Sequence, residues 1–269
     1  MKRLAFMLML CAGMVCAQEG VDVGEASSLR TMVPAEQMEQ QATKSYKQLL
    51  KQAAAKEALA PDSHPQLKRL RAISQRLLPH AERFNPRAAQ WHWEVNLIGS
   101  KQINAFCMPG GKIAFYTGIL DRLKLTDDEV AMIMGHEMAH ALREHAREQA
   151  AKSQLTGLVG GLLGVAASVA GYGGDLTNLA ISAGQGLAGR AFSRSDESEA
   201  DLVGMELAAR GGFDPRAGIT LWEKMAKASK GAPPEFLSTH PANASRIEEI
   251  RSHLPDVMPL YERAQANLQ

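Results

Sequence analysis

The sequence predicts an α+β fold that is mostly helical and contains one small mixed β-sheet. Long stretches are rich in helix-favouring residues or repeat apolar residues at helical spacing, and Pro and Gly clusters separate them. Three short strand-like segments lie between residues 91 and 117, and the last two flank a Pro-Gly-Gly turn. The length of 269 residues suits one sizeable domain with helical arms.

Residues 1–17 have the pattern of a secretion signal. A Lys-Arg pair comes first, and the apolar stretch at 4–15 is too short to span a bilayer comfortably. The small residues of Val15-Cys16-Ala17 are typical of a cleavage site, so we expect cleavage after Ala17 and export to the periplasm. Lipidation of Cys11 or Cys16 is the alternative. We favour cleavage because neither cysteine follows the small residue that usually precedes a lipid-modified one.

The composition argues against a nucleic-acid partner and against sites built from cysteines. Lys and Arg together number 30 against 29 Asp and Glu, and no Lys/Arg run is present, which argues against nucleic acid as the main partner. After cleavage only Cys107 would remain, so we expect neither an intramolecular disulfide nor a cysteine-based zinc cluster.

Two helices are expected before the sheet. Residues 18–34 have a mixed composition, and the stretch 35–59 is rich in Gln, Lys, Glu and Ala, which favour helix. The segment 61–65 carries two prolines and breaks this helix. A second helix is predicted at 66–78, where four apolar residues share one face: Leu67, Leu70, Ile73 and Leu77.

The sheet is expected to consist of one strand and a hairpin. Residues 91–98 alternate between apolar and polar side chains, which is typical of a strand. Residues 103–108 and 112–117 are two further apolar segments, and the turn Pro109-Gly110-Gly111 joins them.

A long helix is predicted to begin at a capping box formed by Thr126 and Glu129. In this motif the Thr hydroxyl accepts from the backbone of the Glu, whose carboxylate reaches back to the backbone of the Thr. The helix is expected to run to about Gln149. Further helices are expected at 195–210, 215–229 and 244–253.

The segment 155–189 is apolar and rich in Gly and Ala. Its first part, 155–170, is short for a membrane span, so we favour a buried or lid-forming helix and keep peripheral membrane contact as the alternative. Within it, 184–189 matches the letters of a dinucleotide-binding fingerprint. That motif needs a preceding strand, which the sequence does not predict, so we discount it.

The strongest functional signal is His136-Glu137-Met138-Ala139-His140. Residues four apart lie on one face of a helix, so the two imidazoles can bind a single zinc ion, and Glu137 beside them can polarise a zinc-bound water. Apolar residues surround the motif, which favours a buried helix over a solvated one. A buried histidine pair needs partners, and a metal supplies them.

A catalytic zinc needs a third protein ligand, and the best candidate is Glu197. Glu197 and Asp201 are four residues apart and share a helix face, so one can bind the metal while the other orients a ligand histidine. Glu199 is expected to face away from them. We interpret His145 as a structural or outer histidine, because a continuous helix would turn it away from the ligand face.

These motifs resemble those of the gluzincin metallopeptidases related to the CAAX prenyl proteases and HtpX. The similarity is greatest to their soluble bacterial envelope branch, the BepA and LoiP type. It rests on the His136–His140 motif, on Glu197-x-x-Ala-Asp201, and on stretches at 104–118 and 238–247. It covers about residues 61–254.

The resemblance implies a zincin-like catalytic domain at 61–254 with one Zn²⁺ per chain, preceded by a linker and helix at 18–60 and followed by a tail at 255–269. It implies Glu197 as the third ligand and Asp201 and Arg246 as residues behind the ligands. The resemblance also places the hairpin beside the cleft, and we expect an extended substrate to bind along Asn104-Ala105-Phe106.

The function expected from motif and resemblance is zinc-dependent endopeptidase activity on unfolded or misassembled envelope proteins, including outer-membrane proteins. A chaperone-like assembly factor with a zinc site and little proteolysis is the alternative. Glu137 favours catalysis, because a structural zinc site would not require it.

His240 is expected at the cleft, and its role stays open. Pro241 biases it towards an extended backbone, and the resemblance places this pair near the metal. His240 is expected either to stabilise the oxyanion, and so act in catalysis with Glu137, or to occupy the zinc in a closed state.

Overall fold

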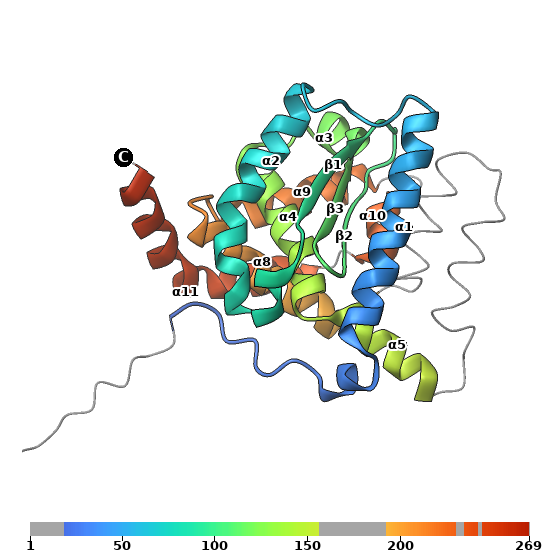
Figure 1. Ribbon diagram of the computed structural model, residues 1–269. Coiled ribbons are helices and arrows are strands. Elements are labelled where there is room, and N and C mark those ends of the chain that lie inside the picture. Colours follow the sequence, from blue (N-terminus) through green and yellow to red (C-terminus); the bar gives the residue numbers. More distant parts are fainter. Residues whose placement is uncertain (1–18, 156–191, 230–233, 242–243, 269) are drawn as a thin grey trace, which may run out of the picture.

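The computed structural model describes residues 19–155, 192–229, 234–241 and 244–268 (Figure 1). The signal segment expected at 1–17 lies outside these residues, as does the segment 155–189 apart from Leu155. No helix in the described ranges is both long enough and apolar enough to cross a membrane.

The α+β, mostly helical fold predicted from the sequence is confirmed. The helices are α1 (Ala35–Ala55), α2 (Pro65–Leu77), α3 (Thr117–Leu123), α4 (Asp127–Leu142), α5 (His145–Leu155), α8 (Arg194–Arg210), α9 (Ala217–Ala228), α10 (Glu235–Thr239) and α11 (Ala244–Leu268). Short 3-10 helices span Ser28–Met32, Leu78–Arg83 and Pro86–Gln90.

The sheet has three strands: β1 (Glu94–Ile98), β2 (Ala105–Met108) and β3 (Lys112–Tyr116), in the order β1-β3-β2. β2 and β3 form the predicted antiparallel hairpin, and β1 pairs with β3 in parallel, so the sheet is mixed. The turn depends on Gly111, whose φ is 75° and where an added Cβ would lie 2.6 Å from the Trp93 ring.

Alternation along the strands sends side chains to two different cores. Ala114 and Tyr116 of β3 face α1 and pack with its Tyr46 and Leu49. Ile113 and Phe115 face the other way and join the main core. Helix α1 therefore covers one face of the sheet, and α2 and α4 cover the other (Figure 1).

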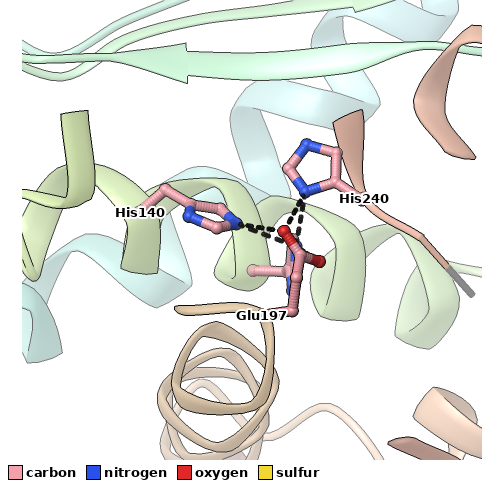
Figure 2. Close-up of side chains that lie close together, drawn as sticks. His140, Glu197 and His240 are labelled. Atoms are coloured by element: carbon pink, nitrogen blue, oxygen red, sulfur yellow. Dashed lines mark hydrogen bonds and ion pairs between the residues drawn. The ribbon is translucent and has the colours of Figure 1, made fainter. Parts of the chain in front are cut away.

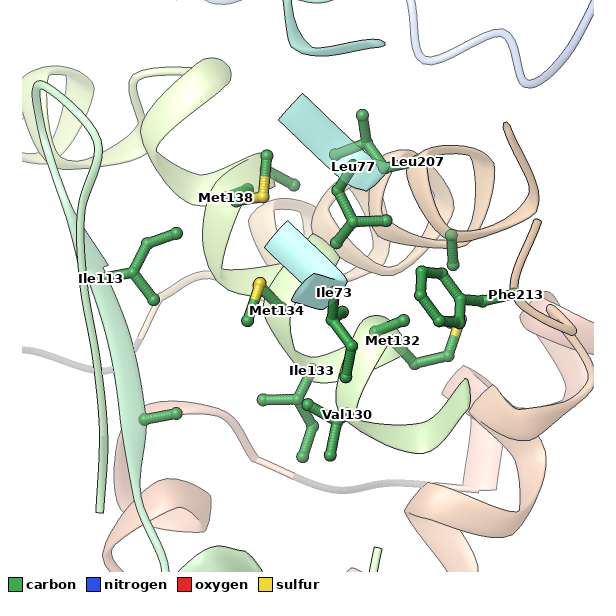
Figure 3. Packing of buried hydrophobic residues seen from close by; sticks show 14 of the residues in the cluster. Ile73, Leu77, Ile113, Val130, Met132, Ile133, Met134, Met138, Leu207 and Phe213 are labelled. Atoms are coloured by element: carbon green, nitrogen blue, oxygen red, sulfur yellow. The ribbon is translucent and has the colours of Figure 1, made fainter. Parts of the chain in front are cut away.

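Helix α4 runs through the centre of the main core. Every residue from Glu129 to Leu142 is buried. Figure 3 shows its apolar side chains between α2, β3 and α8, whose contributions include Ile73, Ile113 and Leu207. A helix that is apolar on all sides must be enclosed on all sides, which fixes the position of the His136–His140 motif inside the molecule.

Two glycines let α4 and α8 approach almost to backbone contact. A Cβ on Gly135 would lie 2.6 Å from the Gly204 carbonyl oxygen, and a Cβ on Gly204 would lie 2.6 Å from the His136 nitrogen. Real Cβ atoms do not approach backbone this closely, so both positions require glycine. This crossing brings the histidine motif of α4 against the acidic motif of α8.

Both helices begin at capping boxes. The box predicted at Thr126 and Glu129 is confirmed, with its two hydrogen bonds at 3.2 and 2.8 Å. A second box, formed by Ser193 and Asp196, opens α8. It satisfies the first free backbone N–H groups of the helix just before Glu197 and so holds that residue in the first turn.

Three predicted helix ends were wrong. The first helix ends at Ala55 instead of residue 59. The helix expected to reach Gln149 ends at Leu142, because Glu144 adopts a positive φ of 59° and Asn85 hydrogen-bonds the Leu142 carbonyl.

The last helix, expected at 244–253, continues to Leu268 through Pro255 and Pro259. Each proline removes one helical donor. Val257 and Leu260 are nevertheless buried in the main core, and this burial holds the extra turns in place.

Candidate metal centre and catalytic site

Four potential metal ligands meet where α4, α8 and the end of α10 come together. They are His136, His140, Glu197 and His240, and one ligand atom from each lies within 4.8 Å of the others. All four residues are buried. Figure 2 shows His140, Glu197 and His240 pointing toward one another above α8.

The two histidines of the sequence motif face each other across the site. His136 Nε2 and His140 Nε2 are 3.1 Å apart, which follows from their spacing of one helical turn. Glu197 approaches both from α8, with Oε2 3.5 Å from His136 Nε2 and Oε1 3.5 Å from His140 Nε2. The structure thus brings together the three residues that the sequence nominated as ligands.

His240 enters the same group from the end of α10. Its Nδ1 lies 2.9 Å from Glu197 Oε1 and 3.2 Å from His136 Nε2. Its backbone N–H donates to the Phe236 carbonyl at 2.8 Å, and its ring stacks on that of Phe236 with centroids 4.5 Å apart. His240 is therefore held among the ligand atoms, at the cleft as expected, and is not a free turn residue.

Asp201 and Arg246 lie directly behind His136. Asp201 Oδ1 is 3.0 Å from His136 Nδ1, while Arg246 donates to both Asp201 oxygens at 2.6 and 2.7 Å and pairs with Glu197 Oε2 at 2.7 Å. The Arg246 guanidinium is buried and stacks 3.7 Å above the Trp222 ring.

This pairing controls the charge of Asp201. Burial alone would raise the pKa of Asp201, but Arg246 and His136 outweigh it and lower that pKa to about 2. Because an ionised carboxylate only accepts hydrogen bonds, His136 Nδ1 carries the proton. In the neutral imidazole, Nε2 then presents a lone pair to the site.

Glu137 lies beside the ligands. Its Oε1 is buried and accepts no hydrogen bond from any described residue, and His240 Nε2 is 3.5 Å away. Burial raises the pKa of Glu137, which makes it a stronger base. The pKa of His140 is lowered well below its usual value by burial and by the neighbouring histidines, so His140 is neutral.

The residues present fit a divalent metal ion. Three neutral or anionic donor groups converge in a buried site, and the lone pair of His136 Nε2 points at His140 Nε2. Two imidazole nitrogens and one carboxylate oxygen are a donor set that zinc accepts.

His145 and Glu199 lie outside the ligand group, as expected, but they make contacts that the sequence did not predict. Glu199 is only partly exposed: it pairs with Arg143, and its Oε2 is 2.9 Å from His145 Nε2. His145 Nδ1 in turn lies 2.8 Å from His140 Nδ1. The prediction that His145 turns away assumed a continuous helix, and the break at Glu144 returns it to His140.

The predicted substrate segment lies at the outer edge of the sheet. Asn104 directly precedes β2, and Ala105 and Phe106 are its first two residues. Within the described residues β2 pairs with β3 alone, so its other edge is free. Asn104 is turned inward and its Oδ1 accepts from the Ala105 N–H at 2.9 Å. None of the three joins the ligand group.

A depression connects this edge with the site. It holds about 560 Å³, part of which is open to solvent, and it lies between β2, α1 and the end of α4. Its walls include Trp91, Phe106, Met108, His140 and Phe192. A metal-ligand candidate and apolar side chains therefore share one cavity next to the sheet edge.

Comparison with known proteins gives one family. A model of peptidase family M48 matches residues 64–254. The mitochondrial metalloendopeptidase OMA1 of Schizosaccharomyces pombe is 37% identical over 166 residues, which cover 61% of this chain and 47% of the relative. The β-barrel assembly-enhancing protease of Escherichia coli is 30% identical over 199 residues, covering 71% of this chain and 39% of the relative. The chain thus spans less than half of the length of these relatives.

Proposed function

The chain belongs to peptidase family M48, and we propose that it is a zinc-dependent endopeptidase that cleaves unfolded or misassembled proteins of the bacterial cell envelope. The family match confirms the resemblance drawn from the motifs, and with it a metal-using peptide hydrolase. The observation that carries the proposal is the buried group of two imidazoles and one carboxylate beside Glu137, whose Oε1 lacks a hydrogen bond within the described structure.

We assign the zinc to His136, His140 and Glu197. When bound, zinc would supply Lewis-acid chemistry, which lowers the pKa of water and polarises a carbonyl. Asp201 and Arg246 hold the His136 ring with its Nε2 toward the site, and Arg246 also fixes Glu197. The ligands are therefore positioned before any metal arrives, which favours tight binding.

Glu137 acts as the general base in this proposal. Its raised pKa and its unbonded Oε1 suit it to take the proton of the attacking water and later to return it to the leaving amine. Burial excludes bulk water from both transfers.

His240 lies among the proposed zinc ligands, where water and substrate would have to bind during catalysis. Because its Nδ1 lies within hydrogen-bond distance of both His136 and Glu197, we favour the closed-state role over oxyanion stabilisation. His240 would then limit cleavage until a substrate displaces it. This arrangement also gives the assembly-factor alternative its support, since a closed site would show little proteolysis.

The depression beside β2 suits an extended, unfolded substrate. A segment added along Asn104–Phe106 would lie next to the apolar walls formed by Trp91, Phe106 and Phe192, where an apolar side chain can be buried. Unfolded polypeptides expose such side chains and folded ones conceal them. The geometry thus supports a preference for unfolded substrates.

The envelope location rests on the signal pattern at 1–17 and on the bacterial relatives, which are named β-barrel assembly-enhancing proteases. The mitochondrial relatives are of similar identity, so relatedness alone does not choose the substrate.

Two substrates and a chelator test the proposal. The zinc-loaded protein should cleave a urea-unfolded β-barrel outer-membrane protein faster than the same protein folded in detergent, and a zinc chelator should stop both reactions. If the zinc-loaded protein binds the unfolded substrate but does not cleave it, the assembly-factor alternative is favoured instead.

A further inference from the structure

We propose that His145, Glu199 and Arg143 form a chain of hydrogen bonds that fixes the ring orientation and the tautomer of His140. The inference rests on the proposed function, because it concerns a ligand of the proposed zinc site. It adds three positioning residues that lie outside the ligand set.

The chain of contacts is continuous and mostly buried. His140 Nδ1 lies 2.8 Å from His145 Nδ1, and His145 Nε2 lies 2.9 Å from Glu199 Oε2. Arg143 pairs with the other Glu199 oxygen and also donates to the Gly24 carbonyl at 2.8 Å. The His145 side chain is only 1% exposed, so water does not replace these partners.

The contacts define which nitrogen carries each proton. Glu199, paired with Arg143, is ionised and can only accept, so His145 Nε2 carries a proton. A neutral His145 then has a bare Nδ1, which must accept from a protonated His140 Nδ1. A neutral His140 is left with a bare Nε2, and this is the atom that faces His136 and Glu197.

The opposite arrangement would disable the ligand. If His145 were doubly protonated, it would donate to His140 Nδ1 and move the His140 proton to Nε2. His140 could not then bind a metal through that atom. The tautomer of His145 therefore reports directly on the proposal.

The same architecture stands behind the other histidine ligand. His136 contacts the carboxylate of Asp201, which is paired with buried Arg246. Behind His140, a carboxylate paired with an arginine is also present, but one imidazole is inserted between it and the ligand. Such outer partners fix ring orientation and raise the basicity of a ligand histidine.

Local structure explains how His145 reaches this position. Helix α4 ends at Leu142, and the positive φ of Glu144 redirects the chain before α5 begins at His145. The face of the His140 ring is fixed separately by Phe192, which stacks on it with centroids 3.9 Å apart and planes 20° apart. Phe192 thus sets the plane of the His140 ring, and His145 sets which of its two nitrogens faces the site.

Nitrogen-15 NMR of the histidine rings in the zinc-loaded protein tests the tautomers without reference to activity. We expect His145 as the Nε2–H tautomer and His140 as the Nδ1–H tautomer. A His145 ring protonated at Nδ1, whether singly or doubly, would overturn the proposal.

Zinc affinity, measured by competition with a chromophoric chelator, supplies the second readout. His145→Leu removes both hydrogen bonds and should weaken zinc binding about 10–100-fold. His145→Asn should lose less, because its Oδ1 can take the place of Nδ1 as acceptor for His140. His253→Leu is the matched control: His253 is partly exposed and contacts Asp256 instead of the site, so the variant should bind zinc like the wild type.

The outcomes separate this inference from the proposed function. Wild-type zinc affinity in His145→Leu, or equal losses in the Leu and Asn variants, would overturn the positioning role and leave the endopeptidase assignment standing. A wild-type protein that binds no zinc would overturn both.

Discussion

Substituting Gly204 by alanine tests whether the close crossing of α4 and α8 builds the site. The added Cβ would lie 2.6 Å from the His136 nitrogen and 2.9 Å from the Gly135 carbonyl carbon. Both are backbone atoms inside helices, so neither can rotate away, and the helices must separate. Overpacking of this kind costs about 1–3 kcal/mol, with the upper end expected for backbone. The better helix propensity of alanine returns about 1 kcal/mol.

The net expectation is a loss of about 2 kcal/mol of unfolding free energy, or a fall in Tm of about 4–8 °C for a chain of this size. Zinc affinity should fall as well, since the separation moves Glu197 and Asp201 away from His136. Urea unfolding of the metal-free protein and chelator competition measure the two effects independently.

Gly218→Ala is the matched control. Its Cβ would meet the Met132 Cε at 2.9 Å, which is the end of a flexible side chain that can move. Helix α9 carries none of the proposed ligands, so stability should change little and zinc affinity not at all. A Gly204→Ala protein as stable as the wild type, with unchanged zinc affinity, would refute the reasoning about the crossing.

Four further outcomes are expected. Asp201→Asn should lower zinc affinity about 10–100-fold. In the metal-free wild type, Asp201 has a depressed pKa of about 2. Its contribution to stability is therefore present above about pH 4 and is lost as the pH falls toward 2. The unfolding free energy, measured as a function of pH, should show this loss in the wild type and less of it in Asp201→Asn. Glu206 is fully buried, pairs with Arg83 and Arg210, and accepts from the Val21 N–H at 2.7 Å. Glu206→Gln should therefore destabilise the chain by about 2 kcal/mol in urea unfolding, as is typical for losing hydrogen bonds to a charged group. An unchanged unfolding free energy would mean that water satisfies both arginines in the variant. His240→Ala should keep its zinc and cleave unfolded protein faster than the wild type, whereas a slower reaction would favour the oxyanion role.

Local signals predicted much of the fold. The Thr126 capping box, the glycine turn of the hairpin and the apolar periodicity of α2 each act within a few residues, and the structure contains all three. The break at Glu144 was not predictable in this way, because its positive φ coincides with an ion pair between its carboxylate and Arg30, which lies far away in the sequence.

In the candidate site too, the features set by local sequence were predicted and those set by tertiary contacts were not. Helical spacing alone placed His136 near His140 and Glu197 on the same face as Asp201, and the structure brings these four together. The position of Arg246 was available only by resemblance.

The contact between His140 and His145 was missed, because it needs the chain reversal at Glu144. The face-to-face packing of α4 and α8 was missed too, since Gly135 and Gly204 lie far apart in sequence and a lone helical glycine has several meanings.

The central claim is that Glu137 is the base beside a zinc ion held by His136, His140 and Glu197. The most direct test is Glu137→Gln, with zinc per chain measured by elemental analysis and cleavage of unfolded protein measured on the same sample. We expect one zinc per chain and a fall in kcat of about 100- to 10,000-fold, since the amide cannot accept the proton of water. Full activity in this variant, or a wild-type protein that cleaves equally well after its metal is removed, would contradict the account.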